Sequence, residues 1–437
     1  MIFRFLNWTF LILIIAPMIL GQTKTAAKID EYFSTLASEN WFNGSVLVAQ
    51  NNKIILRKAY NISSNNQSQP VTIKSKVIIA SVSKLFTKTS ILKLAELKKF
   101  SLDDKLDKFI PDFPNGNKIT IKNLLEHTSG LPRELKDYEE YESLSLEKIV
   151  ELAKKEKLEF EPATRFLYSN IGYHLLQFII SKVESYPKFT VENILKPSKI
   201  FSTNEYNFAK PTKLFALGFS DDDEGNLKNI DEISINRTQT GNFYSTADDL
   251  FEFIKAIDQQ KFLKPPFSEM MFDKDGILEH AGGRAGYRAW LHYNRQTKFE
   301  FIFLSNYSDI PFEAIRNDIP KIVFQKPYQI PQRTIKKAVG ISLDVLQKYV
   351  GVYELEVDKT QKFKVSVENG KLCILDKENN KTMFQAESEF KFFTNPKSAD
   401  GIEFVPTKDG TKFDLVFWEG GRKIIARKID WNNKSYF

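Results

Sequence analysis

Ser81 and Lys84 stand three residues apart, where a short apolar segment at residues 77–80 gives way to a helical pattern that continues to Phe100. Residues three apart lie on nearly the same face of a helix, so this spacing places the lysine amine beside the serine hydroxyl. A serine needs an adjacent base to become a nucleophile, and a desolvated lysine can lose its proton near neutral pH. An ordinary serine N-cap would give the same spacing, so partners must come from elsewhere in the chain.

Three later groups of residues can exchange protons or donate hydrogen bonds. They are His127-Thr128-Ser129-Gly130-Leu131-Pro132, Tyr168-Ser169-Asn170 and His280-Ala281-Gly282-Gly283. A tyrosine becomes a proton acceptor near neutral pH only if a nearby cation lowers its pKa from about 10. Taken singly, these groups could also be a packed aromatic with a helix cap, a braced loop, and a residue that flanks a turn.

In order and content, the four groups resemble the serine β-lactamase and penicillin-binding-protein superfamily. The similarity is closest to the class C-like branch of β-lactamases, D-aminopeptidases, D,D-peptidases and esterases, and it extends from about residue 42 to residue 306. Smaller matches occur in the expected order: Leu102-Asp103-Asp104, Ile110-Pro111, Glu161-Pro162, Ser245-Thr246-Ala247 and Leu304-Ser305-Asn306. Each is weak alone, and together they are very unlike a chance arrangement.

The resemblance assigns a catalytic role to three side chains. It implies that Ser81 is the acylated nucleophile and that Lys84 is its proton partner. Tyr168 would be the general base and acid, with its pKa lowered by the neighbouring lysine. Asn170 would hydrogen-bond the substrate amide or hold Lys84.

The resemblance also assigns a strand at the edge of the site. His280-Ala281-Gly282 matches the His-x-Gly form of a motif that is often Lys-Thr-Gly. By this likeness Gly282 leaves room for the substrate, and the Gly283 N–H completes an oxyanion hole with the N–H of Ser81. His127 would brace the neighbouring loop.

Three departures from the family pattern bear on specificity. Pro162-Ala163 replaces the usual Pro-Gly, and Thr240-Gly241-Asn242 replaces a double glycine. His280 stands where β-lactamases mostly have lysine, which removes a permanent cation for a substrate carboxylate. This favours esterase or D-amino-acid peptidase chemistry over efficient penicillin hydrolysis.

The surrounding elements indicate one α+β unit over residues 22–326. An apolar stripe predicts a helix over residues 22–40, and Asn51-Asn52-Lys53 predicts a hairpin between two apolar segments. Strands are expected at residues 289–293 and 299–304. Strands at both ends with helices between them favour an antiparallel sheet flanked by helices.

A second, smaller domain is expected after the hydrolase-like region. Residues 327–345 are proline-spaced and basic, which is typical of a linker. Residues 346–437 show short alternating strands separated by turn signals, which predict a small all-β barrel. The sequence Tyr349-Val350-Gly351-Val352-Tyr353 resembles the opening of lipocalin-like barrels appended to several of these hydrolases.

Composition excludes several classes of protein. The 437 residues carry a net charge of +7, but the lysines are interleaved with acids and no nucleic-acid-binding signature appears. The four histidines lack metal-ligand spacing, so we expect neither a metal nor a cofactor. Cys373 is the single cysteine, so no intrachain disulfide can form.

The N-terminus predicts export. Arg4 precedes an apolar core at residues 10–16, and polar residues follow, as in a secretory signal peptide over residues 1–21 with cleavage near Gly21. An uncleaved anchor is the alternative, and membrane attachment is expected only in that case. A periplasmic or secreted location follows.

The sequence therefore predicts an exported serine hydrolase that forms an acyl-enzyme on Ser81. Its substrates would be small molecules or peptides: esters, D-amino-acid amides or peptides, peptidoglycan-derived peptides or β-lactam-like compounds. The alternative is a non-catalytic cell-envelope binding protein that descends from the same fold.

Overall fold

The computed structural model describes residues 23–63, 70–136, 144–207, 212–222, 225–230, 243–333, 335–357, 359, 361–376, 380–398, 400–419 and 422–429. The expected signal peptide and the Thr240-Gly241-Asn242 departure lie outside these residues. No helix among the described residues is long and apolar enough to cross a membrane.

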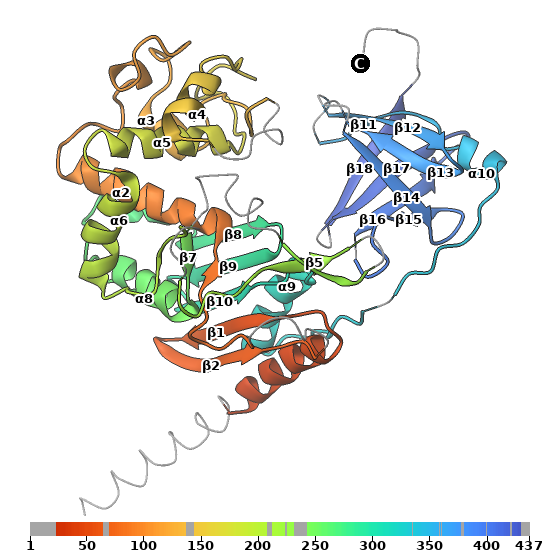
Figure 1. Ribbon diagram of the computed structural model, residues 1–437, viewed down its shortest axis with the longest axis horizontal. Helices are drawn as coiled ribbons and strands as arrows, with labels where there is room; N and C mark the ends of the chain where they lie inside the picture. The colour runs from red at the N-terminus through yellow and green to blue at the C-terminus, as the bar shows by residue number, and fades with distance from the viewer. Residues whose placement is uncertain are drawn as a thin grey trace, which may run out of the picture. The chain divides into compact units, whose positions relative to one another are not determined.

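The chain forms two compact units (Figure 1). The first reaches Ala37 and includes Phe42–Phe219 and Asn229–Ser308; the second comprises Ser38–Trp41, Ser220–Lys228 and Asp309–Phe437.

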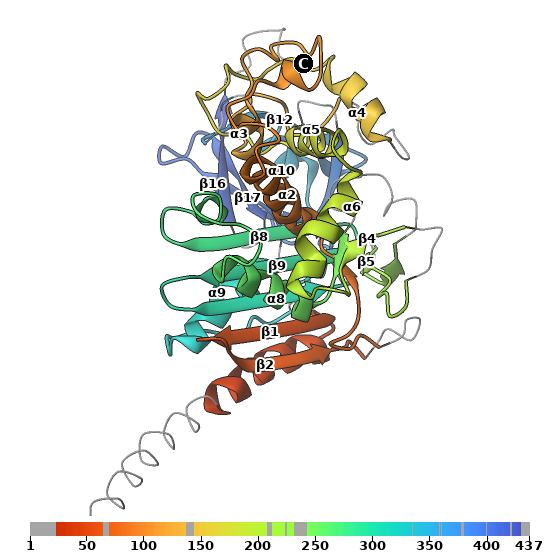
Figure 2. The same cartoon turned by 90° about the vertical axis from the view of Figure 1, so that its left-hand side faces the viewer.

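A five-stranded antiparallel sheet forms the base of the first unit, in the order β2-β1-β10-β9-β8 (Figure 2). Its strands are β1 (Gly44–Gln50), β2 (Lys53–Tyr60), β8 (Ile277–Arg284), β9 (Tyr287–Asn294) and β10 (Phe299–Ser305). The central strand β10 is buried along its whole length, which explains its nearly continuous apolar sequence. Asn51 and Asn52 both have positive φ, as a tight hairpin turn requires, so the predicted hairpin is confirmed.

Helices pack on this sheet. The predicted N-terminal helix is present over residues 23–38, and its Phe33 stacks on Tyr60 of β2 and meets Phe42 edge to face. Helix α8 (Ala247–Asp258) contacts β1 and β10. Thr246 caps α8 by accepting a hydrogen bond from the Asp249 N–H at 3.2 Å, as its position before the helix predicts.

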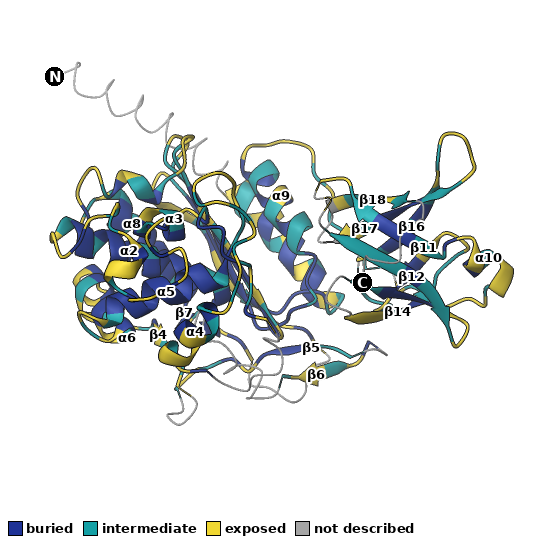
Figure 3. Cartoon of the chain, turned by 90° about the horizontal axis from the view of Figure 1, so that it is seen from above, coloured by how far each residue is buried: buried dark blue, intermediate teal, exposed yellow. Residues whose placement is uncertain are grey.

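A second helical layer surrounds α2 (Lys84–Glu96), which is buried on nearly every side. Its neighbours are α5 (Asn170–Ser181) and α6 (Tyr186–Thr190), and α2 and α5 appear as dark blue ribbons in Figure 3. The remaining elements of this region are η1 (Ala80–Ser83), η2 (Leu106–Lys108), α3 (Ile121–Leu125), α4 (Leu146–Ala153), η4 (Val191–Leu195), η5 (Lys196–Ser198) and η6 (Glu269–Met271). Its short strands are β3 (Val77–Ile78), β4 (Asn204–Glu205) and β7 (Phe243–Ser245). The strands β5 (Phe219–Asp221) and β6 (Leu227–Asn229) pair with each other and belong mostly to the second unit.

The second unit contains a closed barrel of eight antiparallel strands in sequential order, from β11 to β18. They are β11 (Gly351–Leu355), β12 (Lys362–Glu368), β13 (Lys371–Leu375), β14 (Lys381–Ala386), β15 (Lys391–Phe393), β16 (Gly401–Pro406), β17 (Phe413–Glu419) and β18 (Arg422–Ile429). Tyr349 stacks on Phe404 in its core, with ring centroids 4.1 Å apart. This up-and-down closure confirms the predicted lipocalin-like barrel.

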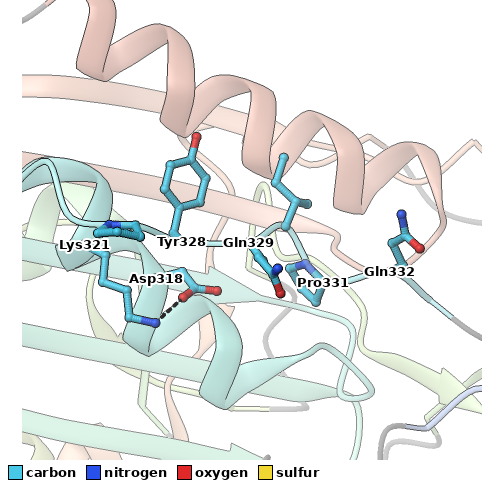
Figure 4. A pocket seen from close by; sticks show the side chains of 8 residues that line it. Asp318, Lys321, Tyr328, Gln329, Pro331 and Gln332 are labelled. Carbon is cyan, nitrogen blue, oxygen red and sulfur yellow. Dashed lines mark hydrogen bonds and ion pairs between the residues drawn. The ribbon is translucent and has the colours of Figure 1, made fainter.

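Two helices precede the barrel in the second unit, α9 (Phe312–Val323) and α10 (Leu343–Gln347). A hollow beside α9 is lined by Asp318, Lys321 and residues 327–332 (Figure 4). Asp318 and Lys321 form an ion pair there at 2.8 Å. None of the residues expected in the catalytic site lines this hollow. The α+β sheet flanked by helices and the following barrel confirm the expected fold class.

Candidate active site

Ser81 lies in η1, the short turn that joins β3 to α2. The Ile79 N–H donates a hydrogen bond to the Phe243 carbonyl of β7 at 2.9 Å, which anchors the chain just before the turn. Ala80 then adopts φ +45°, an uncommon value for a residue with a side chain. This backbone conformation places half-buried Ser81 at the N-terminal, positive end of the α2 dipole, where a developing negative charge is stabilised.

Lys84, on the first turn of α2, contacts the serine as the three-residue spacing predicts. Its Nζ donates a hydrogen bond to Ser81 Oγ at 3.2 Å, and the residue is only 2% exposed. Burial lowers the pKa of Lys84 to about 7; the charge of Glu134 opposes this shift and that of Arg133 adds to it. Near neutral pH, a substantial fraction of this lysine is a neutral amine.

Tyr168 is also hydrogen-bonded to Ser81 and lies among cations and rings. Lys84 Nζ is 5.1 Å and Arg133 Cζ is 5.3 Å from its ring centroid, and the His127 ring stacks on it at 4.5 Å. Burial nevertheless raises the pKa of Tyr168, outweighing the lowering effects of the Ser81 hydrogen bond and the Arg133 charge. The expectation that a neighbouring lysine lowers this pKa is therefore wrong, because desolvation of the phenolate dominates.

His127 and Ser169 fix the start of α5 beside the site. The Ser169 N–H donates to His127 Nδ1 at 3.0 Å, so that nitrogen carries no proton. Burial and the Lys84 charge lower the pKa of His127 to about 3, so the ring is neutral at pH 7. Ser169 Oγ donates to the Pro132 carbonyl at 2.7 Å and caps α5 through the Gly172 N–H at 3.1 Å. The bracing role expected of His127 is present.

The loop around Gly130 packs closely against the segment that leads to Tyr168. Gly130 has φ +80°, and a Cβ there would lie 2.2 Å from the Phe160 carbonyl oxygen. Further along, the Leu167 N–H donates to the His127 carbonyl at 2.9 Å. A side chain at position 130 would clash with the neighbouring backbone, which explains why the motif His127–Pro132 has glycine there.

Asn170 contacts an acidic residue that sequence analysis did not single out. Asn170 Nδ2 donates a hydrogen bond to Glu134 Oε1, and its backbone N–H donates to the Arg133 carbonyl at 2.8 Å. Asn170 does not hold Lys84, because its buried Oδ1 accepts no hydrogen bond from any described residue. Burial raises the pKa of Glu134. In the sequence, the feature that could have pointed to Glu134 is its position two residues after the His127–Pro132 motif.

Strand β8 carries the His280-Ala281-Gly282-Gly283 motif. The strand continues to Arg284, so the whole motif lies within it and the turn begins only afterwards. His280 Nδ1 is 2.7 Å from the Ala281 carbonyl, and its ring centroid is 6.4 Å from that of Tyr168. Burial and the Lys84 charge lower the pKa of His280 to about 4, so its ring is neutral at pH 7.

The two glycines of β8 have different surroundings. A Cβ at Gly282 would lie 2.2 Å from the Ile79 carbonyl oxygen, so this glycine permits β8 to pack against the segment that carries Ser81. That packing accounts for the missing side chain. Gly283 is exposed, and its Cβ position meets only the Arg288 side chain, at 3.5 Å or more.

Residues 29–320 match the family model described as Beta-lactamase, and this range contains every expected site residue. The chain belongs to the Beta-lactamase family. This is a family of serine hydrolases, so the expected superfamily is confirmed.

Individual proteins support this assignment. The chain is 29% identical over 445 residues to "Penicillin-binding protein 4*" of Bacillus subtilis (strain 168), covering 91% of this chain and 98% of that protein. The octameric penicillin-binding protein homologue from Pyrococcus abyssi is 21% identical with a TM-score of 0.62, covering 92% of this chain and 99% of that one. The D-amino acid amidase from Ochrobactrum anthropi SV3 is 18% identical with a TM-score of 0.59, covering 69% and 98%. These two structures share the fold.

Proposed function

We propose that this protein is an exported serine hydrolase that forms an acyl-enzyme on Ser81. The observation that carries the proposal is the hydrogen bond from buried Lys84 to Ser81 Oγ, at 3.2 Å. A lysine whose pKa is about 7 can accept the serine proton at neutral pH.

Lys84 and Tyr168 would divide the proton transfers. In acylation, Ser81 Oγ bonds to the substrate carbonyl carbon while its proton moves to neutral Lys84 Nζ. The protonated phenol of Tyr168 gives its proton to the departing group as the bond to that group breaks, and the Lys84 ammonium then reprotonates Tyr168. In deacylation, a water attacks the ester carbonyl and gives its proton to Lys84, which returns a proton to Ser81 Oγ.

Backbone groups would stabilise the oxyanion. The N–H groups of Ser81 and Gly283 are assigned to the oxyanion hole, since η1 packs beside β8 and Gly283 follows the close-packed Gly282. The family resemblance assigns Asn170 to the substrate amide, and the hydrogen bond from its Nδ2 to Glu134 Oε1 holds its side chain in place. His280 is neutral and can exchange hydrogen bonds with the substrate, but it supplies no fixed positive charge.

We assign short esters, D-amino-acid amides and peptidoglycan-derived peptides as substrates. The neutral His280 disfavours efficient β-lactam hydrolysis, because it offers no permanent cation on β8 for the drug carboxylate. The D-amino acid amidase from Ochrobactrum anthropi SV3 shares the fold and motivates the choice of D-residue amides as probes. Export is tested by the N-terminal residue of protein recovered outside the cytoplasm, which we expect to lie near Gln22.

Active-site labelling tests the central claim. A fluorophosphonate probe should add one label to the wild-type protein and none to Ser81→Ala, as measured by intact-protein mass spectrometry. Labelling that persists in the variant would overturn the assignment of Ser81. Folded wild-type protein that neither labels nor cleaves p-nitrophenyl acetate or D-alanyl peptides would support a binding protein instead.

Penicillin exposure separates the possible activities. A stable penicilloyl adduct on Ser81 without turnover would indicate a penicillin-binding D,D-peptidase, and rapid hydrolysis of the drug would indicate a β-lactamase. Fast ester cleavage without an adduct would favour an esterase. The neutral state of His280 leads us to expect slow drug hydrolysis.

A further inference from the structure

Four basic side chains lie around Tyr168, and they differ in how much positive charge they supply at pH 7. Lys84 is committed to the serine and has a pKa of about 7, whereas His127 and His280 are neutral because their pKa values are about 3 and about 4. Arg133 is different, because a guanidinium remains charged at neutral pH and well above it. Its Cζ lies 5.3 Å from the Tyr168 ring centroid. A fixed cation therefore stands next to the proposed proton donor.

The guanidinium of Arg133 is available to a ligand. Its side chain is 68% exposed, and its ion-pair contact among the described residues is a long one, with Nε 4.0 Å from Glu134 Oε1. Glu134 Oε1 already accepts a hydrogen bond from Asn170. Among the described residues, no group hydrogen-bonds the two terminal nitrogens of Arg133. Its backbone is nevertheless held in place, because its carbonyl accepts the Asn170 N–H at 2.8 Å.

We propose that Arg133 is a specificity-determining residue that binds a carboxylate on the leaving group of the substrate. This inference rests on the proposed function. Tyr168 is assigned to protonate the leaving group, so a cation stacked on Tyr168 lies on the leaving-group side of the bond that breaks. An extended residue spans about 3.5 Å, so a carboxylate one or two residues beyond that bond can reach the guanidinium.

The chemistry of the guanidinium suits this role. Its planar fork binds a carboxylate through two parallel hydrogen bonds, which a lysine cannot reproduce. The substrate class is therefore an ester, amide or peptide whose leaving group ends in a free carboxylate. Arg133 thus supplies the positive charge that His280 does not, but from the loop that follows α3 and not from β8.

A matched pair of substrates isolates this effect. The acetyl esters of 3-hydroxybenzoate and of 3-hydroxybenzamide give the same acyl-enzyme and differ only in the charge of the leaving group. We would measure the ratio of kcat/KM for the carboxylate ester to kcat/KM for the carboxamide ester in the wild type, in Arg133→Gln and in Arg133→Lys. Any change in the pKa of Tyr168 affects both esters alike, so the ratio reports recognition of the carboxylate alone.

We expect Arg133→Gln to lower the ratio by about tenfold to a hundredfold, as the loss of a charge-assisted hydrogen bond implies. Arg133→Lys should give an intermediate ratio, because it keeps the charge and loses the fork. Arg165→Gln is the control: Arg165 is exposed and lies over the Phe160 ring, with its Cζ 5.0 Å from the centroid. It should leave the ratio unchanged.

Two results would overturn the inference. One is an unchanged ratio in Arg133→Gln, and the other is an equal fall in Arg165→Gln. Fluorophosphonate labelling of the same preparations keeps the two proposals apart. If wild-type Ser81 labels and the ratio is unchanged, only the role of Arg133 fails; if Ser81 does not label, the proposed function fails.

Discussion

Two side chains contact the Ser81 hydroxyl, and burial acts on them in opposite directions. Desolvation disfavours the charged form of each group, so it lowers the pKa of Lys84 to about 7 and raises that of Tyr168. At neutral pH the lysine can accept a proton while the phenol can only donate one. The two groups therefore differ in role although they lie side by side.

The first residue-scale prediction concerns pH. kcat/KM should rise with pH through about 7 as Lys84 loses its proton. Glu134→Gln should move this midpoint to lower pH by about one unit, because the Glu134 charge raises the pKa of Lys84. The glutamine keeps an oxygen for the Asn170 hydrogen bond. Glu126→Gln, which removes a charge that acts on neighbouring Lys88, is the control and should leave the midpoint in place. A midpoint unmoved by Glu134→Gln would contradict the coupling.

At this scale the sequence predicts contacts better than protonation. The Ser81–Lys84 hydrogen bond follows from helical spacing alone. The pKa of Tyr168 does not, because it depends on how much water the fold removes from the phenol. The contact between Glu134 and Asn170 likewise depends on folding, because the two residues are 36 apart in the sequence.

At the scale of elements, β8 packs directly on the segment that carries Ser81. Gly282→Ala should place a methyl group 2.2 Å from the Ile79 carbonyl oxygen and force the two segments apart. We expect a loss of about 1–3 kcal/mol in unfolding free energy and a large loss of activity. Thermal unfolding compared with Gly283→Ala checks this, since the atoms nearest to a Cβ there belong to the Arg288 side chain and lie 3.5 Å or more away. Equal stability of the two variants would refute the packing role.

Strand β10 carries a buried acid that gives a separate prediction. Glu300 is 1% exposed, its Oε2 has no hydrogen-bond partner among the described residues, and burial raises its pKa to about 7. The folded state thus binds a proton more tightly than the unfolded chain, and stability falls as pH rises from about 4.5 to 7. Glu300→Gln should therefore stabilise the protein by about 3 kcal/mol at pH 8 and have little effect below pH 4.5.

Urea unfolding of Glu300→Gln at a series of pH values measures this difference. Glu147→Gln is the control and should lack the same pH dependence, because Glu147 is an exposed residue of α4 and is not among the charges that act on Glu300. A stabilisation that is equal at pH 4 and pH 8 would exclude titration of Glu300 as its cause.

The prediction of elements from sequence succeeded where local patterns are strong. The Asn51-Asn52 hairpin and the N-terminal helix each follow from a few adjacent residues. Residues 134–160 are charged and helical in pattern, yet among the described residues of this stretch the helix α4 covers Leu146–Ala153. The start of α5 at Asn170 depends on Ser169, whose hydroxyl caps the helix and also donates to the distant Pro132 carbonyl.

At the scale of the whole molecule, the barrel could be predicted from alternating strands and turn signals, whereas the contacts of the segment before it could not. Residues 327–345 have the composition of a linker, yet Arg333 within them is buried in the second unit. Its guanidinium pairs with Asp221 at 2.7 Å, with side chains 6% and 0% exposed. It also donates to the carbonyls of Glu39 and Asn40. One side chain thus joins three stretches of sequence that are far apart.

Arg333→Ala should therefore destabilise the second unit strongly. Removing the cation leaves the Asp221 carboxylate buried without its charge partner and two carbonyls without this donor, which costs about 3–5 kcal/mol. Lys321→Ala is the matched control, because it breaks the more exposed Asp318–Lys321 pair on α9, where an ion pair contributes about 0.5 kcal/mol. Thermal unfolding with tryptophan fluorescence distinguishes the two. If Arg333→Ala unfolds at the same temperature as Lys321→Ala, residues 327–345 act as a simple tether, and composition alone describes them adequately.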